Sequence, residues 1–221
     1  MERSAVVWTR GLQSPRYIVA DLIFYERHLP HWLPPGADIF LTFRLADSLP
    51  REVLERFQAE AQVSQMNQTL DPAQLYAERK RYFGRFDELL ANAGHGLTWL
   101  RQPEIAALVT QSIHHFDGKN FELLAYCVMS NHVHLVVRLP EDAPLLMRTM
   151  QRVKGYSALQ ANRLLGRTGS FWQAESYDHV VRNGELARII AYVVENPVKA
   201  GLVDDWEHWP FTYVAEVART L

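Results

Sequence analysis

The residues with the clearest chemistry are two histidines two positions apart, His132 and His134. They open an apolar, β-branched run that predicts a strand. Side chains at i and i+2 of a strand point to the same face, so the two imidazoles would lie side by side, with Val133 turned the other way into a core. Two neutral imidazoles at this spacing form half of a divalent metal site. The alternative is a pair of strand histidines hydrogen-bonded to their neighbours.

A second group with chemistry lies on a predicted helix over residues 184–195. Its apolar stripe should face the core, and Tyr192 falls away from the centre of that stripe. Asn196 follows one turn later on the side of Tyr192. The helix therefore offers a hydroxyl and an amide oxygen together. The alternative is a tyrosine at the edge of the core and an asparagine that ends the helix.

The elements that must position these groups follow from periodicity and from breakers. Asn183 is the predicted N-cap of the helix that carries Tyr192, and Pro197 should end that helix. Further helices should begin near Pro50 and after Asp71-Pro72, and a tight turn is expected at Ser130-Asn131. The predicted strands are 38–46, 121–129, 132–139 and 175–182, and the other predicted helices are 104–115 and 143–165.

The resulting order, β-α-β-β-α-β followed by one more helix, is ferredoxin-like. We predict an α+β fold with an antiparallel sheet, helices on one face, and an additional C-terminal helix that carries the tyrosine. Residues 62–100 are polar and charged, and we interpret them as a helical insertion after the first strand. The whole chain, 1–221, is expected to form a single domain of this kind.

Charge, cysteine content and apolar runs indicate the kind of partner and the compartment of the protein. The formal net charge is −2, so overall charge does not indicate a nucleic-acid binder, but cations outnumber acids between residues 147 and 188 and predict a local phosphate-binding surface. The alternative there is a solvated helix face. The lone Cys127 lies in an apolar run and favours a reducing compartment. With neither a signal peptide nor an apolar run of about 20 residues, a soluble, cytoplasmic protein is expected.

Three motifs together carry a resemblance to a known family. They are Met129-Ser130-Asn131 before the histidine pair, Trp172-Gln173 before a strand, and the block from Tyr192 to Val203. In this order and spacing, from about Ile39 to Tyr213, the chain resembles the REP-associated tyrosine transposases, which are single-tyrosine HUH endonucleases. The family often has proline where Ser130 stands, and 62–100 is longer than its smallest members need.

The resemblance implies a fold, a site and a reaction. The metal-binding histidines of the family fall on His132 and His134, its nucleophile falls on Tyr192, and Asn196 stands where a third ligand is expected. The implied cofactor is Mg²⁺ or Mn²⁺. The implied partner is single-stranded DNA with palindromic hairpins. The implied reaction cuts this DNA through a 5′-phosphotyrosine link and rejoins it. The resemblance further implies a monomer or homodimer in the cytoplasm, associated with the nucleoid.

The remaining expectations concern DNA contacts and two alternative functions. Arg148, Arg152 and Lys154 are expected to contact the DNA backbone, and Trp172 and Tyr177 to stack on unpaired bases. Solvation or core packing is the alternative for each. The first rival function is a metal-dependent hydrolase without a covalent step, using the histidine pair with another histidine or a carboxylate. The second is a domesticated nucleic-acid-binding module without catalysis.

Overall fold

The computed structural model describes residues 36–65, 71–91, 96–142 and 145–220 of the chain. The parts of the predicted insertion at 66–70 and 92–95, and the predicted helix start at 143–144, lie outside these residues. The strands are β1 (Asp38–Leu45), β2 (Glu122–Val128), β3 (His132–Arg138), β4 (Trp172–Val180) and β5 (Thr212–Val214). The helices are α1 (Arg51–Gln65), α2 (Pro72–Ala91), α3 (Pro103–His114), α4 (Leu146–Leu164), α5 (Leu186–Val194), α6 (Asn196–Lys199) and α7 (Glu216–Arg219), with 3-10 turns at Trp99–Arg101 and Trp206–His208.

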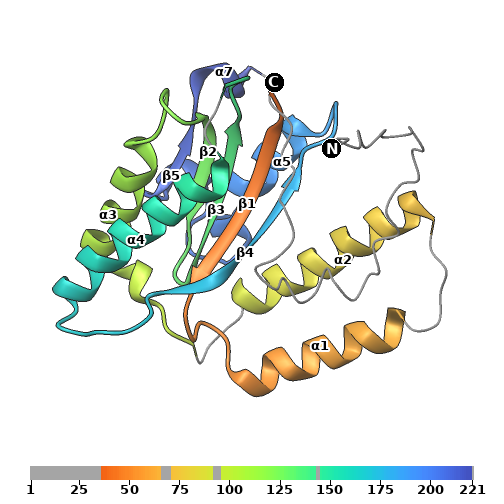
Figure 1. Ribbon diagram of the computed structural model, residues 1–221, viewed down its shortest axis with the longest axis horizontal. Coiled ribbons are helices and arrows are strands. Elements are labelled where there is room, and N and C mark those ends of the chain that lie inside the picture. The colour runs from red at the N-terminus through yellow and green to blue at the C-terminus, as the bar shows by residue number, and fades with distance from the viewer. Residues whose placement is uncertain (1–35, 66–70, 92–95, 143–144, 221) are drawn as a thin grey trace, which may run out of the picture.

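The five described strands form one sheet in the order β4-β1-β3-β2-β5, and every neighbouring pair is antiparallel (Figure 1). The order of the first four strands is that of the predicted ferredoxin-like fold, which the structure confirms. The strand β5 was not predicted. It is three residues long and extends the sheet beside β2, so it carries too little alternation to stand out in the sequence.

The two faces of the sheet support two separate apolar cores. Ile39, Leu41 and Phe43 of β1 point to one core, which α3 and α4 cover. Phe40, between them in sequence, points to the other core, which α5 and Phe83 of α2 cover. This alternation follows from the two-residue period of a strand. The two major helices, α3 and α4, lie on one face as predicted, whereas the helix of Tyr192, for which no face was predicted, lies on the opposite face with α2.

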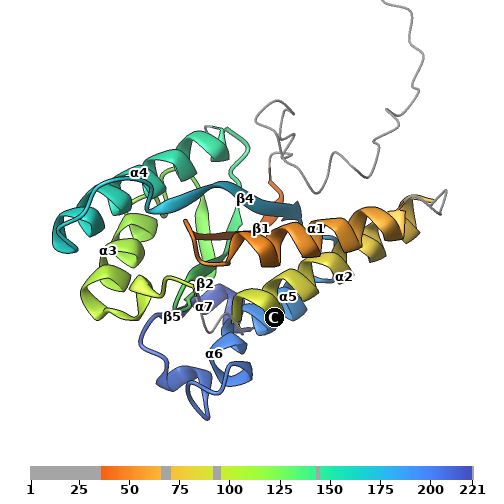
Figure 2. The same cartoon turned by 90° about the horizontal axis from the view of Figure 1, so that it is seen from below.

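Two helices, α1 and α2, fill most of the stretch between β1 and α3 and project from the sheet as a hairpin-shaped arm (Figures 1 and 2). Within this arm, Phe57 packs on Tyr82 with ring centroids 4.6 Å apart. The end of α2 reaches the sheet, where Asn131 Nδ2 donates to the Leu90 carbonyl oxygen at 2.9 Å. The arm is therefore anchored at the loop that precedes β3.

The start of α5 differs from the prediction. Asn183 is not the N-cap, because Glu185 stands at that position and Gly184 takes a left-handed turn with φ of 80°. Glycine reaches this φ without strain, so the chain turns here before the helix begins. The helix ends at Val194 and Pro197 falls inside the short α6, as proline in a first turn can. None of the described helices combines the length and apolarity that a bilayer crossing requires.

Candidate metal and nucleophile site

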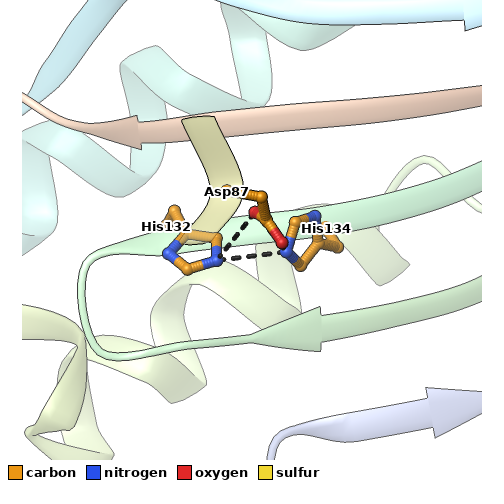
Figure 3. Close-up of side chains that lie close together, drawn as sticks. All are labelled: Asp87, His132 and His134. Atoms are coloured by element: carbon orange, nitrogen blue, oxygen red, sulfur yellow. Dashed lines mark hydrogen bonds and ion pairs between the residues drawn. The ribbon is translucent and has the colours of Figure 1, made fainter. Parts of the chain in front are cut away.

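The histidine pair lies on β3, on the sheet face that α2 and α5 cover. Both side chains are fully buried, and their Nε2 atoms are 3.1 Å apart (Figure 3). Strand alternation explains this placement, since Val133 between them points into the opposite core with 0% exposure. The sequence-based expectation of two adjacent imidazoles thus agrees with the geometry.

Each imidazole is held through its other nitrogen. His132 Nδ1 is 2.6 Å from Asn131 Oδ1, and His134 Nδ1 is 2.8 Å from Thr42 Oγ1 on β1. The Asn131 amide nitrogen donates to Leu90 O, so its Oδ1 is the atom that accepts from His132. With its proton on Nδ1, the His132 imidazole presents an Nε2 lone pair to the site. This is the arrangement in which a histidine serves as a metal ligand.

Asp87 of α2 completes the group, and it was not among the predicted site residues. Its Oδ1 lies 3.2 Å from His134 Nε2 and 3.6 Å from His132 Nε2 (Figure 3). The carboxylate is buried, and together with the two histidines it forms a cluster of donors suited to a metal ion. The available signal was helical spacing. Phe83, Asp87 and Leu90 share one face of α2, and a carboxylate in such an apolar stripe indicates a buried partner.

Burial and charge set the protonation states in this cluster. Burial, and then the neighbouring His134, lower the pKa of His132 to about 3, so its imidazole is neutral at pH 7. Burial alone would raise the pKa of Asp87, but the two imidazoles and a hydrogen bond from Tyr192 lower it below its ordinary value. The site therefore presents a carboxylate and a neutral imidazole, which are the forms that bind a divalent cation.

Tyr192 reaches the same cluster from α5. Its ring lies 5.9 Å from the His134 ring, measured between centroids, and its hydroxyl donates a hydrogen bond to Asp87 Oδ2. Burial and the Asp87 carboxylate raise the pKa of the phenol above its ordinary value. The exposed Lys199 places its Nζ 4.7 Å from the centre of the ring. The structure thus brings together Asp87, His134 and Tyr192, which lie up to 105 positions apart in the sequence.

Asn196 lies close to Tyr192 but makes contacts within its own helical segment. Its Nδ2 donates to the Tyr192 carbonyl oxygen at 2.8 Å and to the Val193 carbonyl oxygen at 3.4 Å. The side chain is buried and held against the turn that carries the tyrosine. These bonds correspond to the helix-ending alternative, and the role of Asn196 as a metal ligand stays a prediction.

The predicted DNA contacts on α4 lie on the other face of the sheet. Arg148 and Arg152 are exposed there, and the Arg152 guanidinium covers the Phe116 ring at 4.9 Å. Lys154 Nζ is tied to β4, donating to Gln173 O at 2.7 Å, Ala174 O at 3.0 Å and Ser176 Oγ at 3.2 Å. Lys154 therefore connects α4 to the sheet, whatever else it contacts.

The two predicted stacking residues on β4 differ in surroundings. Trp172 is 7% exposed, packs on Phe43 and donates its indole N–H to Ser157 Oγ at 3.0 Å. This is the core-packing alternative, and a base could reach the ring only if this core opened. Tyr177 faces the site side and stacks on Phe83 of α2 with centroids 4.2 Å apart. It therefore joins the aromatic wall beside the histidine pair.

Comparison with known proteins identifies the part of the chain that holds most of this site. Residues 102–196 match the family described as Transposase IS200 like. His132, His134, Tyr192 and Asn196 all lie inside this matched range, whereas Asp87 precedes it.

Two curated relatives resemble the chain over about half of its length. A protein of Escherichia coli K12 named REP-associated tyrosine transposase is 32% identical over 103 residues, which is 46% of this chain and 59% of the relative. A Haemophilus influenzae Rd protein with the same family name is 30% identical over 119 residues, which is 49% of this chain and 66% of the relative. The chain thus matches less than two thirds of either relative.

A solved structure of a REP-associated tyrosine transposase bound to a REP hairpin also resembles the chain. The superposition covers 84% of this chain and 81% of that one, with 19% identity and a TM-score of 0.47.

Proposed function

We propose that this chain is a metal-dependent endonuclease and transposase that nicks single-stranded hairpin DNA through a covalent 5′-phosphotyrosine link and can rejoin the strands. The observation that carries the proposal is the 5.9 Å approach of the Tyr192 ring to the His134 ring, since it puts a nucleophile beside a paired-histidine site. The match to the IS200-like transposase family and the two transposase relatives support the same class of reaction.

The proposed cofactor is Mg²⁺ or Mn²⁺, held by His132 and His134, with Asn196 as a further predicted ligand. The donor set fits a divalent cation, because the histidine Nε2 atoms and the buried Asp87 Oδ1 converge within 4.8 Å of one another. A bound cation would polarise the scissile phosphate and favour in-line attack.

Nucleophilic attack, imidazole positioning and DNA binding are assigned to other residues of the chain. Tyr192 forms the new phosphate ester and frees a 3′-hydroxyl, so the phosphodiester is exchanged and not lost to water. That exchange allows rejoining without an external energy source. Asn131 and Thr42 hold the two imidazoles. On the far face of the sheet, the exposed Arg148 and Arg152 are the proposed contacts to the DNA backbone.

A labelled-DNA assay tests this function. The substrates are single-stranded oligonucleotides that contain a palindromic hairpin with unpaired flanks, incubated with Mn²⁺ and then denatured. A 3′ label should move into a protein–DNA adduct, whereas a 5′ label should appear in a free, shorter strand with a 3′-hydroxyl. Tyr192→Phe should abolish both products. Tyr156→Phe, which alters a 51% exposed tyrosine on α4, is the matched control and should leave them unchanged.

One observation favours a second candidate. Asp87 supplies the carboxylate that a metal-dependent hydrolase would add to the histidine pair. Under that function, cleavage survives in Tyr192→Phe and no adduct forms with either label. Binding of the oligonucleotides without cleavage in Mg²⁺ or Mn²⁺ would instead indicate a recognition module and contradict both catalytic functions.

A further inference from the structure

The helical arm contributes a side chain to a site that otherwise lies in the range matched to the IS200-like family. Asp87 lies on α2, ahead of the matched range 102–196, and is buried against His132 and His134 (Figure 3). An aspartate is rarely buried unless it is paired with a cation or accepts several hydrogen bonds. Its position therefore calls for a specific partner.

The three donor atoms are spaced as ligands of one small cation. The separations are 3.1 Å between the two Nε2 atoms, and 3.2 and 3.6 Å from Asp87 Oδ1 to them. Around a divalent cation with bonds of about 2.1 Å, neighbouring donors are roughly 3.0–3.4 Å apart. The three atoms therefore form one cap of a coordination shell and leave its other side for substrate.

The hydrogen-bond inventory points the same way. Asp87 Oδ1 is a buried atom without a hydrogen bond of good geometry from the described residues, although His134 Nε2 lies 3.2 Å from it. His132 carries its proton on Nδ1, toward Asn131, so its Nε2 offers a lone pair and not a proton. A carboxylate oxygen and an imidazole lone pair facing each other in a dry site repel unless a cation lies between them.

The second carboxylate oxygen has a separate contact. Asp87 Oδ2 accepts the hydrogen bond of the Tyr192 hydroxyl, while Oδ1 faces the two imidazoles. One carboxylate therefore spans the distance between the histidine pair and the nucleophile. The phenol is held at the edge of the three-donor cap and cannot turn away from it without losing this bond.

We propose that Asp87, supplied by the arm, is a third protein ligand of the metal and that it orients Tyr192 through its other oxygen. This inference rests on the proposed metal-dependent function and adds a residue to it. The arm would then have a role in metal binding, because α2 completes the coordination of a site whose histidines lie on β3.

Direct metal binding tests the proposal without relying on DNA cleavage. Mn²⁺ is titrated into the full chain, with free Mn²⁺ followed by electron paramagnetic resonance and the heat by calorimetry. The variants are Asp87→Asn, Asp87→Ala and His132→Ala. Glu88→Gln is the matched control, since Glu88 is the exposed neighbour on the same helix. Circular dichroism and thermal melting establish that each variant is folded.

We expect Asp87→Asn and Asp87→Ala to weaken Mn²⁺ binding by at least about tenfold. His132→Ala should weaken it as strongly, and Glu88→Gln should stay within about twofold of the parent. Equal Mn²⁺ affinity in Asp87→Asn and the parent would overturn the ligand role alone. If Asp87 instead blocks the site, Asp87→Ala would keep its affinity and form the DNA adduct faster, which also overturns the proposal. A parent protein that binds no Mn²⁺ would remove the metal-dependent function itself.

Discussion

At the residue scale, the site depends on side chains that hold other side chains. Asn131 is the clearest of these, because one end of its amide accepts from His132 and the other donates to Leu90 of α2. Asn131 was expected in a tight turn and in the motif before the histidine pair, without a role of its own, yet its buried amide determines which nitrogen of His132 faces the site. Such partners tune metal affinity although they do not touch the metal.

Asn131→Ala should therefore weaken Mn²⁺ binding by about tenfold, through a histidine whose ring and tautomer are no longer fixed. Calorimetry well below the melting temperature measures this, so that lost packing does not enter. Ser130→Ala, in the same turn, is the control and should bind as the parent does. Unchanged affinity in Asn131→Ala would mean that the strand alone orients His132.

At the element scale, local patterns predicted the elements well and their partners poorly. The β2–β3 hairpin and the helix of Tyr192 follow from alternation and from an apolar stripe, both of which are encoded in neighbouring residues. The face on which a helix packs is a long-range property, so α5 and α2 were not expected opposite α4. Asp87 was missed for this reason, because the stretch 62–100 is polar and charged as a whole and the spacing of Phe83, Asp87 and Leu90 does not say which surface their face covers.

The same limit applies to Lys154, which was predicted to contact DNA and is tied to β4 in the structure. Lys154→Ala should lower the free energy of unfolding by about 1–3 kcal/mol, because a charged group loses three hydrogen bonds between α4 and the sheet. Urea denaturation measures this. Arg148→Ala, exposed on the same helix, should change stability by less than about 0.5 kcal/mol. Equal losses of unfolding free energy in Lys154→Ala and Arg148→Ala would contradict the role of Lys154 in holding α4 to β4.

At the scale of the whole molecule, side chains of the arm connect it to α5 and to the sheet. The arm is connected to α5 by an ion pair between Lys80 and Glu185 at 3.1 Å, and to the site by Asp87. The sequence suggested an insertion at 62–100 without indicating that it would cover the histidine pair. Its packing on the site depends on contacts between residues about 40 or more positions apart.

If Asp87 binds the metal, Mn²⁺ should stabilise the arm. We expect amide hydrogen exchange in α2 to slow when Mn²⁺ is added, and to slow more than exchange in α3 on the opposite face, because bound ligands suppress openings that break their site. Mass spectrometry of peptides from both helices measures the difference. In Asp87→Asn the α2 effect should disappear. Equal slowing of α2 and α3 in the parent would indicate a general effect on stability.

The sheet separates the two proposed contact regions for DNA, because Tyr192 lies beside one face and the exposed arginines of α4 lie on the other. A DNA strand bound at α4 must therefore pass around an edge of the sheet to reach Tyr192. The edge strand β4 offers such a path, since α4 is bonded to its start and Tyr177 faces the site side. The thickness of the protein at this edge would then fix the length of DNA strand between α4 and Tyr192. Under the proposed function, the length of this path would set the number of unpaired nucleotides between the foot of the hairpin and the cleavage position.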